Sequence, residues 1–205
     1  TINGVTNYPG LVQNGTSSIN GNSNVTVKNI HVNSSGSTLA DNGGWIGHSY
    51  FGKSSSNVLV DNCSSSGAIN GQYSGGICGD FAGYNNGKVT VLNCYSSGDI
   101  SSTRTGGICG AYAGSYGEVT ISNSYSSGNI TGDYSGGICG RYAGNNGKVT
   151  VSNSYSSGSI TGQDAGGIFG YNAGDNNGKA TVSNSYVANG NWSDTDANHN
   201  LKDTP

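Results

Sequence analysis

Five cysteines carry the most readily recognised chemistry in this 205-residue chain, because thiols can bind metals, form disulfides or act as nucleophiles. Their spacings do not match a zinc site, since no CxxC pair occurs and the three histidines are scattered along the chain. We therefore predict no metal ion and no cofactor. The cysteines recur instead at roughly the period of an internal repeat: Cys63, Cys78, Cys94, Cys109 and Cys139.

Carboxylates could supply acid–base chemistry if the fold gathered several of them into one cleft. Hydrolases of this kind work with paired carboxylates that flank the reacting bond. The acidic residues of the central region occupy different places in the repeat, namely Asp61, Asp80, Asp99, Asp133 and Asp164. The sequence therefore predicts no catalytic residue, and we expect no enzymatic activity.

Composition argues against two further classes of function. The chain has a formal net charge of -3 and only 8 lysines and arginines, too few to neutralise a long track of phosphates, so we expect no nucleic-acid partner. No stretch approaches the roughly 18–20 apolar residues that span a bilayer, so we expect no membrane insertion. The most abundant residue is glycine, with 37 copies.

A repeat of about 30 residues organises the chain. Its first landmark is a glycine-rich block that reads GGWIG from Gly43, GGICG from Gly75, Gly106 and Gly136, and GGIFG from Gly166. A second landmark, the start of β-branched runs such as VTV, keeps the same period. Its positions are Val25, Val58, Val89, Val119, Val149 and Ala180. Two landmarks that share one period of this length indicate a solenoid, a propeller or another repeat array.

Each unit contains three short strand-like runs separated by Gly, Ser and Asn corners. A propeller blade needs four strands and commonly about 40 residues, whereas one coil of three short strands suits about 30. We therefore predict an all-β fold, a right-handed parallel β-solenoid of about six coils of 30–33 residues. Residues 1–23 are expected to form a degenerate N-terminal coil or cap, 24–186 the solenoid, and 187–205 a C-terminal cap with a short helix at 193–201.

Stacked coils would place equivalent residues in columns about 4.8 Å apart. Four columns are apolar, and we expect them to fill the interior. They pass through Val89, Val91, Ile100 and Ile108, and the last of them includes Leu11 and Trp45. A column of asparagines, from Asn29 to Asn184, keeps the inward phase of the valines before it, which predicts an internal ladder of amides at a corner.

The motifs GGICG, VTVSNSY, SSG and ITG together resemble the glycine-rich GLUG-type repeats over about residues 25–186. That family occurs in secreted and cell-surface proteins, often adhesin-like chains expected to form β-helices. The present chain departs from the usual pattern by placing Cys, Ile or Phe where a second aliphatic residue is common. The resemblance implies an extracellular, cell-surface or virion-surface location and a structural or adhesive role, and it brings no catalytic residues.

The cysteines belong to two of the predicted columns. One column is otherwise apolar, so we predict that its cysteines are buried thiols acting as small hydrophobic groups. Its members are Val12, Ile46, Cys78, Cys109, Cys139 and Phe169. Cys63 and Cys94 stand where later coils have serine. A spacing of one coil lies within the Cα separation of a disulfide, so in an oxidising compartment we predict a Cys63–Cys94 bond.

Two outward surfaces could bind a partner. Tyrosine recurs once per coil at Tyr95, Tyr125, Tyr155 and Tyr186, and stacked exposed tyrosines would suit self-association, other surface proteins or glycans. A second aromatic column contains Phe81, Tyr112 and Tyr142. The first strands present a grid of small hydroxyls, similar in kind to the flat faces of solenoid ice-binding proteins. This grid contains Thr90, Thr120, Ser122, Thr150, Ser152, Thr181 and Ser183, with a third column at Ser124, Ser154 and Ser185.

We therefore expect a non-catalytic extracellular structural or adhesive module that belongs to a surface fibre, filament or adhesin. The alternative is an ice-binding protein that uses the Thr/Ser face, with ice as its partner. A secreted eukaryotic or viral chain could also carry N-glycans on its sequons. These are Asn14, Asn24, Asn33, Asn129 and Asn191, whereas the sequon at Asn62 is expected to point inward.

Overall fold

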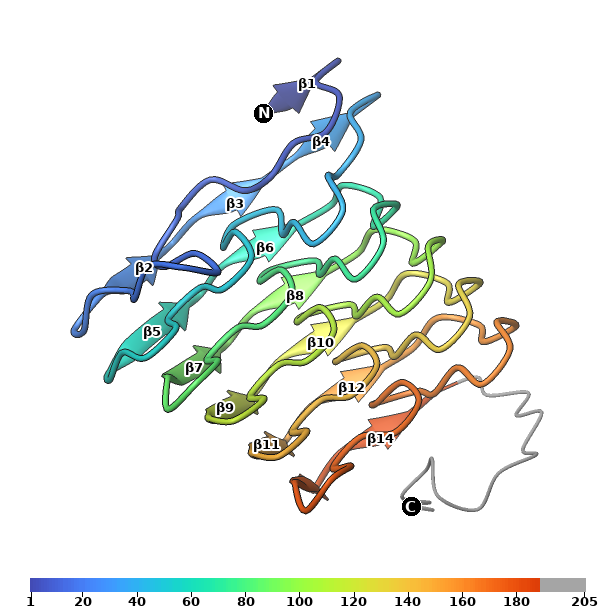
Figure 1. The fold of residues 1–205 in the computed structure, drawn as a ribbon. Helices are drawn as coiled ribbons and strands as arrows, with labels where there is room; N and C mark the ends of the chain where they lie inside the picture. Colours follow the sequence, from blue (N-terminus) through green and yellow to red (C-terminus); the bar gives the residue numbers. More distant parts are fainter. Residues whose placement is uncertain (189–205) are drawn as a thin grey trace.

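The computed structural model describes residues 1–188, and in them the chain winds into a stack of parallel β-coils (Figure 1). Two six-stranded parallel sheets run along the stack. The described residues contain no helix, and hence none that is long and apolar enough to cross a bilayer. The predicted all-β solenoid of about six coils is confirmed. The helix predicted at 193–201 and most of the predicted C-terminal cap lie outside the described residues.

The first sheet is built from the β-branched runs, which pair in register from one coil to the next. Val89, Val119 and Val149 are successive partners, with side chains that point into the coil because every second residue of a strand faces the same side. In spatial order the strands are β2 (Thr26–Lys28), β5 (Val58–Asp61), β7 (Lys88–Leu92), β9 (Glu118–Ser122), β11 (Lys148–Ser152) and β13 (Lys179–Ser183).

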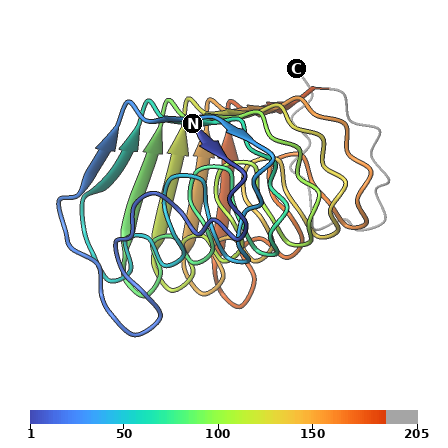
Figure 2. The ribbon, with the colours of Figure 1, turned by 90° about the horizontal axis from the view of Figure 1, so that it is seen from above.

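The second sheet consists of two-residue strands, each one corner after a strand of the first sheet. These strands are β3 (His31–Val32), β6 (Ser64–Ser65), β8 (Tyr95–Ser96), β10 (Tyr125–Ser126), β12 (Tyr155–Ser156) and β14 (Tyr186–Val187). At the N-terminal end, β1 (Ile2–Asn3) pairs with β4 (Ser34–Ser35) in a separate two-stranded sheet. Figure 2 shows the strands as one wall of the stack and the loops of successive coils following one another in sequence order.

Asparagine forms the corner between the two sheets, and the predicted orientation of its side chain is wrong. Asn62, Asn93 and Asn123 have φ values of 51°, 54° and 50°, the left-handed conformation that Asn tolerates better than most residues. This conformation interrupts the strand alternation and leaves the side chains exposed. The amides still bond along the stack: Asn62 Nδ2 donates to Asn29 Oδ1 at 2.8 Å, and Asn123 Nδ2 donates to Asn93 Oδ1 at 3.4 Å.

The remainder of each coil is joined to its neighbours by single bridge positions. The predicted strand around Ile100 is one such position, in a column with Ile69, Ile130 and Ile160. Two further columns of bridges run through the first glycine and the cysteine of the GGICG blocks. These segments turn too often at Gly, Ser and Asn for a longer ladder, but the bridges still keep every coil in register.

The four apolar columns fill the interior as predicted, with one change of register. Gly44, rather than Gly43, pairs with Gly75, so Ile46 belongs to the column of Ile77 and Gly47 to that of Cys78. Trp45 takes the place of Gly76 and is fully buried, with its indole Nε1 donating to the Gly67 carbonyl at 2.9 Å. A Cβ on Gly67 would overlap this indole ring. Leu11, predicted to be interior, is 53% exposed in the first coil.

Candidate binding surfaces

The four predicted tyrosines form one continuous ladder on the second sheet. Each is the first residue of its strand, and the strands pair in register, which places one ring directly above the next. From Tyr95 through Tyr125 and Tyr155 to Tyr186, successive ring centroids lie 5.0, 4.9 and 5.1 Å apart, with interplanar angles of 3°, 2° and 7°. We call these four residues the tyrosine ladder.

The rings of the tyrosine ladder are accessible to a partner. The sequence alone did not establish whether this column is exposed. Tyr95 is 37% exposed and Tyr186 is 52% exposed, while Tyr125 and Tyr155 are half-buried between their neighbours. Partial burial raises the pKa of Tyr125, and the neighbouring Tyr155 and Tyr95 raise it further. The Tyr125 ring is therefore a neutral phenol at physiological pH. Towards the N-terminus the column continues as Ser64 and His31, joined by a 2.8 Å hydrogen bond.

The Thr/Ser face is narrower than predicted. Thr120 and Thr150 pair in register, as do Ser122 and Ser152, and these side chains lie on the outer side of the first sheet. The expected third column is buried, because the asparagine corner turns it inward. Its residues Ser124, Ser154 and Ser185 are at most 5% exposed, and their hydroxyls bond backbone groups.

Charged side chains border the Thr/Ser face. Lys88, Glu118, Lys148 and Lys179 form the first column of the same strands. Lys148 Nζ lies 2.9 Å from Glu118 Oε1, and this bond lowers the pKa of the Glu118 carboxyl. Such exposed pairs contribute at most about 1 kcal/mol, so Glu118 mainly relieves repulsion between stacked lysines. A second ion pair, Lys28–Asp61 at 3.2 Å, interrupts the face near the N-terminal end.

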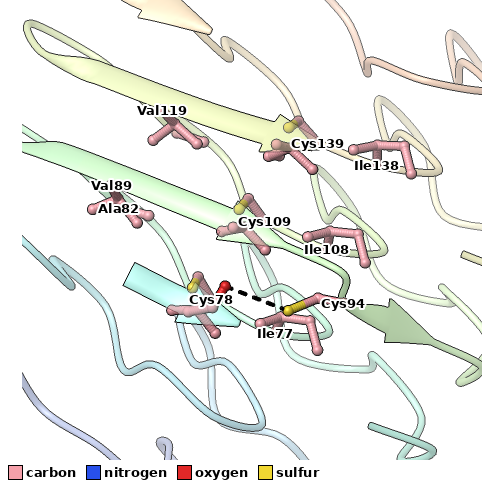
Figure 3. Close-up of a cluster of buried hydrophobic side chains, with 14 of the residues drawn as sticks. Ile77, Cys78, Ala82, Val89, Cys94, Ile108, Cys109, Val119, Ile138 and Cys139 are labelled. Atoms are coloured by element: carbon pink, nitrogen blue, oxygen red, sulfur yellow. Dashed lines mark hydrogen bonds between the residues drawn. The ribbon is translucent and has the colours of Figure 1, made fainter. Parts of the chain in front are cut away.

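All five cysteines are buried free thiols, as Figure 3 shows for Cys78, Cys94, Cys109 and Cys139. The prediction of buried thiols is confirmed for the column of Cys78, whereas the predicted Cys63–Cys94 disulfide is absent. In-register parallel side chains keep the coil spacing of about 4.8 Å. A disulfide instead needs Cβ atoms that converge to about 3.5–4.5 Å. Each of the two thiols contacts a backbone carbonyl, Cys63 that of Asp61 at 3.3 Å and Cys94 that of Leu92 at 3.1 Å.

The buried thiols differ in acidity. A hydrogen bond from the thiol of Cys94 favours a thiolate on Cys63 and lowers the pKa of Cys63 to about 7. The same contact, together with burial, raises the pKa of Cys94. The pKa of Cys78 is raised by the neighbouring Cys109 thiol and by burial. Cys63 is therefore more nucleophilic than Cys78 or Cys94 once reagent reaches it.

Alkylation should test this assignment. In the native chain at pH 8 and without reductant, we expect labelling at least about a hundredfold slower than in urea, since each thiol requires local opening of the coils. Cys63 should react first, and all five should react after denaturation. Mass spectrometry would locate each label. Rapid native labelling of Cys109, or a Cys63–Cys94 disulfide in purified protein, would contradict the assignment.

The sequons differ in accessibility. Asn14 is only 5% exposed, and its side chain holds the backbone of Asn22 through two hydrogen bonds, so this amide is not accessible in the folded chain. Asn24, Asn33 and Asn129 are exposed. Asn191 lies outside the described residues. Asn62 is exposed as well, contrary to the prediction that it points inward.

The acidic residues stay dispersed in the part of the chain that the structure describes. No group of three or more His, Cys, Asp or Glu side chains there has a geometry that could hold a metal ion. Asp80 is the one buried carboxylate of this region, and it has no cationic partner among residues 1–188.

Sequence reasoning missed one cluster of side chains. Arg104 and Arg141 both lie against the ring of Tyr134, with guanidinium carbons 5.7 and 5.2 Å from its centroid. The residues come from two different columns, and only the folded corner brings these columns together. The available signal was that the chain contains just these two arginines, one in each of two successive repeats.

Known proteins give no guide to these surfaces. No family model, no curated protein and no solved structure matches this chain. The resemblance to GLUG-type repeats therefore rests on the repeat motifs alone, and function has to be argued from the surfaces themselves.

Proposed function

We propose that this chain is a non-catalytic structural and adhesive module of an extracellular surface, part of a fibre, filament or adhesin, with the tyrosine ladder as its binding edge. The observation that carries the proposal is the accessibility of four parallel, stacked rings on a scaffold that fixes their spacing. Aromatic side chains supply much of the energy of protein and glycan contacts. A ladder of rings offers the same contact at each coil.

The rigidity of the ladder supports the same proposal. Tyr95, Tyr125 and Tyr155 are held by strands that pair with the coil before and the coil after, and the strand of Tyr186 pairs with the coil before it, so little side-chain freedom remains to be lost on binding. Repetition along the stack also favours an elongated partner, such as a glycan chain or the ladder of a second copy. A repeated weak contact becomes strong through multivalency.

Ice binding is the second candidate, supported by the in-register threonines Thr90, Thr120, Thr150 and Thr181. The face has two hydroxyl columns instead of three, however, and the charged column of Lys88 and Glu118 lies beside them on the same strands. Ordered charges hold water in shells that do not match an ice lattice. We therefore rank ice binding below adhesion.

The double substitution Tyr125→Ser with Tyr155→Ser should weaken association at least about tenfold, because two central aromatic anchors are lost. Sedimentation equilibrium would measure self-association, and a glycan array would measure binding to sugars. Tyr116→Ser is the matched control, since Tyr116 is 52% exposed but lies outside the ladder. It should leave both readouts unchanged.

Two outcomes would count against the proposal. One is a parent protein that neither self-associates nor binds any glycan or surface protein. The other is thermal hysteresis with faceted ice crystals that disappear in Thr150→Tyr, which would promote ice binding instead. We expect no hysteresis, and we expect Thr150→Tyr to associate like the parent.

A further inference from the structure

A cation–aromatic cluster lies where two turns of the coil meet. Tyr73, Arg104 and Tyr134 occupy equivalent positions in the turn that enters the GGICG block, and Arg141 lies in the turn that leaves it. Backbone hydrogen bonds join the two turns, for example from Tyr171 N to the Tyr134 carbonyl at 3.4 Å. The cluster is therefore built from residues of four successive coils and is separate from the tyrosine ladder.

Arg104 lies between the rings of the coils before and after it. Its guanidinium carbon is 5.3 Å from the ring centroid of Tyr73 and 5.7 Å from that of Tyr134. Nη1 donates to Tyr73 Oη at 3.1 Å. These contacts hold the guanidinium plane but use only one of its five N–H donors.

Arg141 is surrounded by three tyrosines. Its guanidinium carbon lies 4.2 Å from the ring centroid of Tyr142 and 5.2 Å from those of Tyr134 and Tyr171. Nη2 donates to Tyr142 Oη at 2.7 Å. The Nε atoms of both Arg141 and Arg104 are buried without a hydrogen-bond partner. Neither arginine forms an ion pair within residues 1–188.

The turn that enters the GGICG block places a left-handed residue at this position in each of these coils. Tyr73, Arg104 and Tyr134 have φ values of 60°, 64° and 59°. The same position is Asn42 in an earlier coil and Asp164 in a later one, residue types that adopt this conformation readily. The left-handed conformation is less favourable for such bulky residues, and the cation–π contacts offset part of this cost.

We propose that this cluster binds an anionic polysaccharide through its carboxylate or sulfate groups. Guanidinium forks pair with such groups in a bidentate manner, and here two forks with unused donors lie against one ring. The surrounding tyrosine rings are half-buried and hold the two guanidinium groups in place. The protein carries a net charge of -3, so attraction to a polyanion requires a local group of cations, and we assign it to this pair of arginines.

Titration calorimetry on the full chain tests the proposal with polygalacturonate for carboxylates and heparin for sulfates. Binding of either should be weakened about tenfold or more in R104Q/R141Q, because charge-assisted hydrogen bonds are lost. The variant K88Q/K179Q removes the same two charges from the first sheet and should bind like the parent. If R104Q/R141Q does not fold, R104K/R141K keeps the charges, loses the forks, and should still bind more weakly.

Neutral dextran and poly-glutamate complete the design. Poly-glutamate should not bind, and any binding of dextran should be unchanged in R104Q/R141Q. The Tyr125→Ser, Tyr155→Ser double variant should retain polysaccharide binding, which separates this site from the tyrosine ladder. The proposal is overturned if neither anionic polysaccharide binds, if the arginine variants bind like the parent, or if K88Q/K179Q loses as much as R104Q/R141Q. Equal binding of poly-glutamate would overturn the assignment to a saccharide.

Discussion

Replacing Gly128 with alanine should destabilise the stack by at least about 4 kcal/mol, a loss reached by few single substitutions. A Cβ at this position would overlap the carbonyl oxygen of Gly98 in the preceding coil and would lie 2.5 Å from its carbonyl carbon. Gly128 does not have a positive φ, so alanine could adopt its backbone conformation, and the cost comes from the close approach of coils alone. Because neighbouring coils share their buried surface, we expect the damage to spread beyond one coil.

Urea unfolding followed by far-UV circular dichroism would measure this loss. Ser127→Ala is the matched control, because Ser127 is the exposed neighbour of Gly128 and its substitution should change the free energy of unfolding by less than about 0.5 kcal/mol. A Gly128→Ala protein with the unfolding midpoint of the parent would show that the coils are not packed backbone against backbone at this corner.

Asp80→Asn should stabilise the protein at neutral pH and should not do so near pH 4. Asp80 is 5% exposed, and its Oδ1 has no hydrogen-bond partner. Burial raises the pKa of this carboxyl well above its usual range, and the Phe81 backbone N–H lowers it only in part. The folded chain therefore keeps the proton that the unfolded chain releases above about pH 4.

The sign of the pH dependence follows from this difference in bound protons. Where the folded state binds more protons than the unfolded state, stability falls as pH rises. The free energy of unfolding begins to fall near the unfolded pKa of about 3.9 and continues to fall up to the folded pKa. Between these two values it falls by about 1.4 kcal/mol for each pH unit. Asparagine removes the proton and with it this loss, so the advantage of Asp80→Asn should grow from pH 4 to pH 8.

Unfolding free energies of parent and Asp80→Asn at pH 4 and pH 8 would measure this effect. Asp99→Asn is the control, since Asp99 is exposed and its Oδ1 accepts a hydrogen bond from Asn129 N that an amide oxygen can also accept. An advantage of Asp80→Asn that is equal at both pH values would show that burial does not perturb this carboxyl.

The columns of the solenoid were predictable because each position of the coil recurs in every repeat, so several residues indicate the same environment. Val91 and Ile121 are buried for the same reason in successive coils, and the tyrosine ladder follows from the same register. The alignment failed at Trp45, where a one-residue difference in loop length shifts Gly44, not Gly43, onto Gly75. The repeat length alone does not determine which of two adjacent glycines pairs with the next coil. The backbone hydrogen bonds of the folded coil determine it.

The corners were less predictable, because alternation cannot be extended through a left-handed residue. Asn123 was assigned inward and Ser124 outward, and the structure reverses both. The tendency of asparagine to adopt positive φ was the signal that could have indicated this reversal. The cluster around Arg104 and Arg141 could not be predicted from the repeat alone, because its residues come from different columns that meet only in the folded coil.

The central claim is that the tyrosine ladder is the surface through which this module adheres. NMR spectra of protein with isotope-labelled tyrosine, recorded as self-association or glycan binding proceeds, test it most directly. We expect the resonances of Tyr95, Tyr125, Tyr155 and Tyr186 to shift together while that of Tyr116 stays in place. Binding that leaves the four ladder resonances unchanged would contradict the claim.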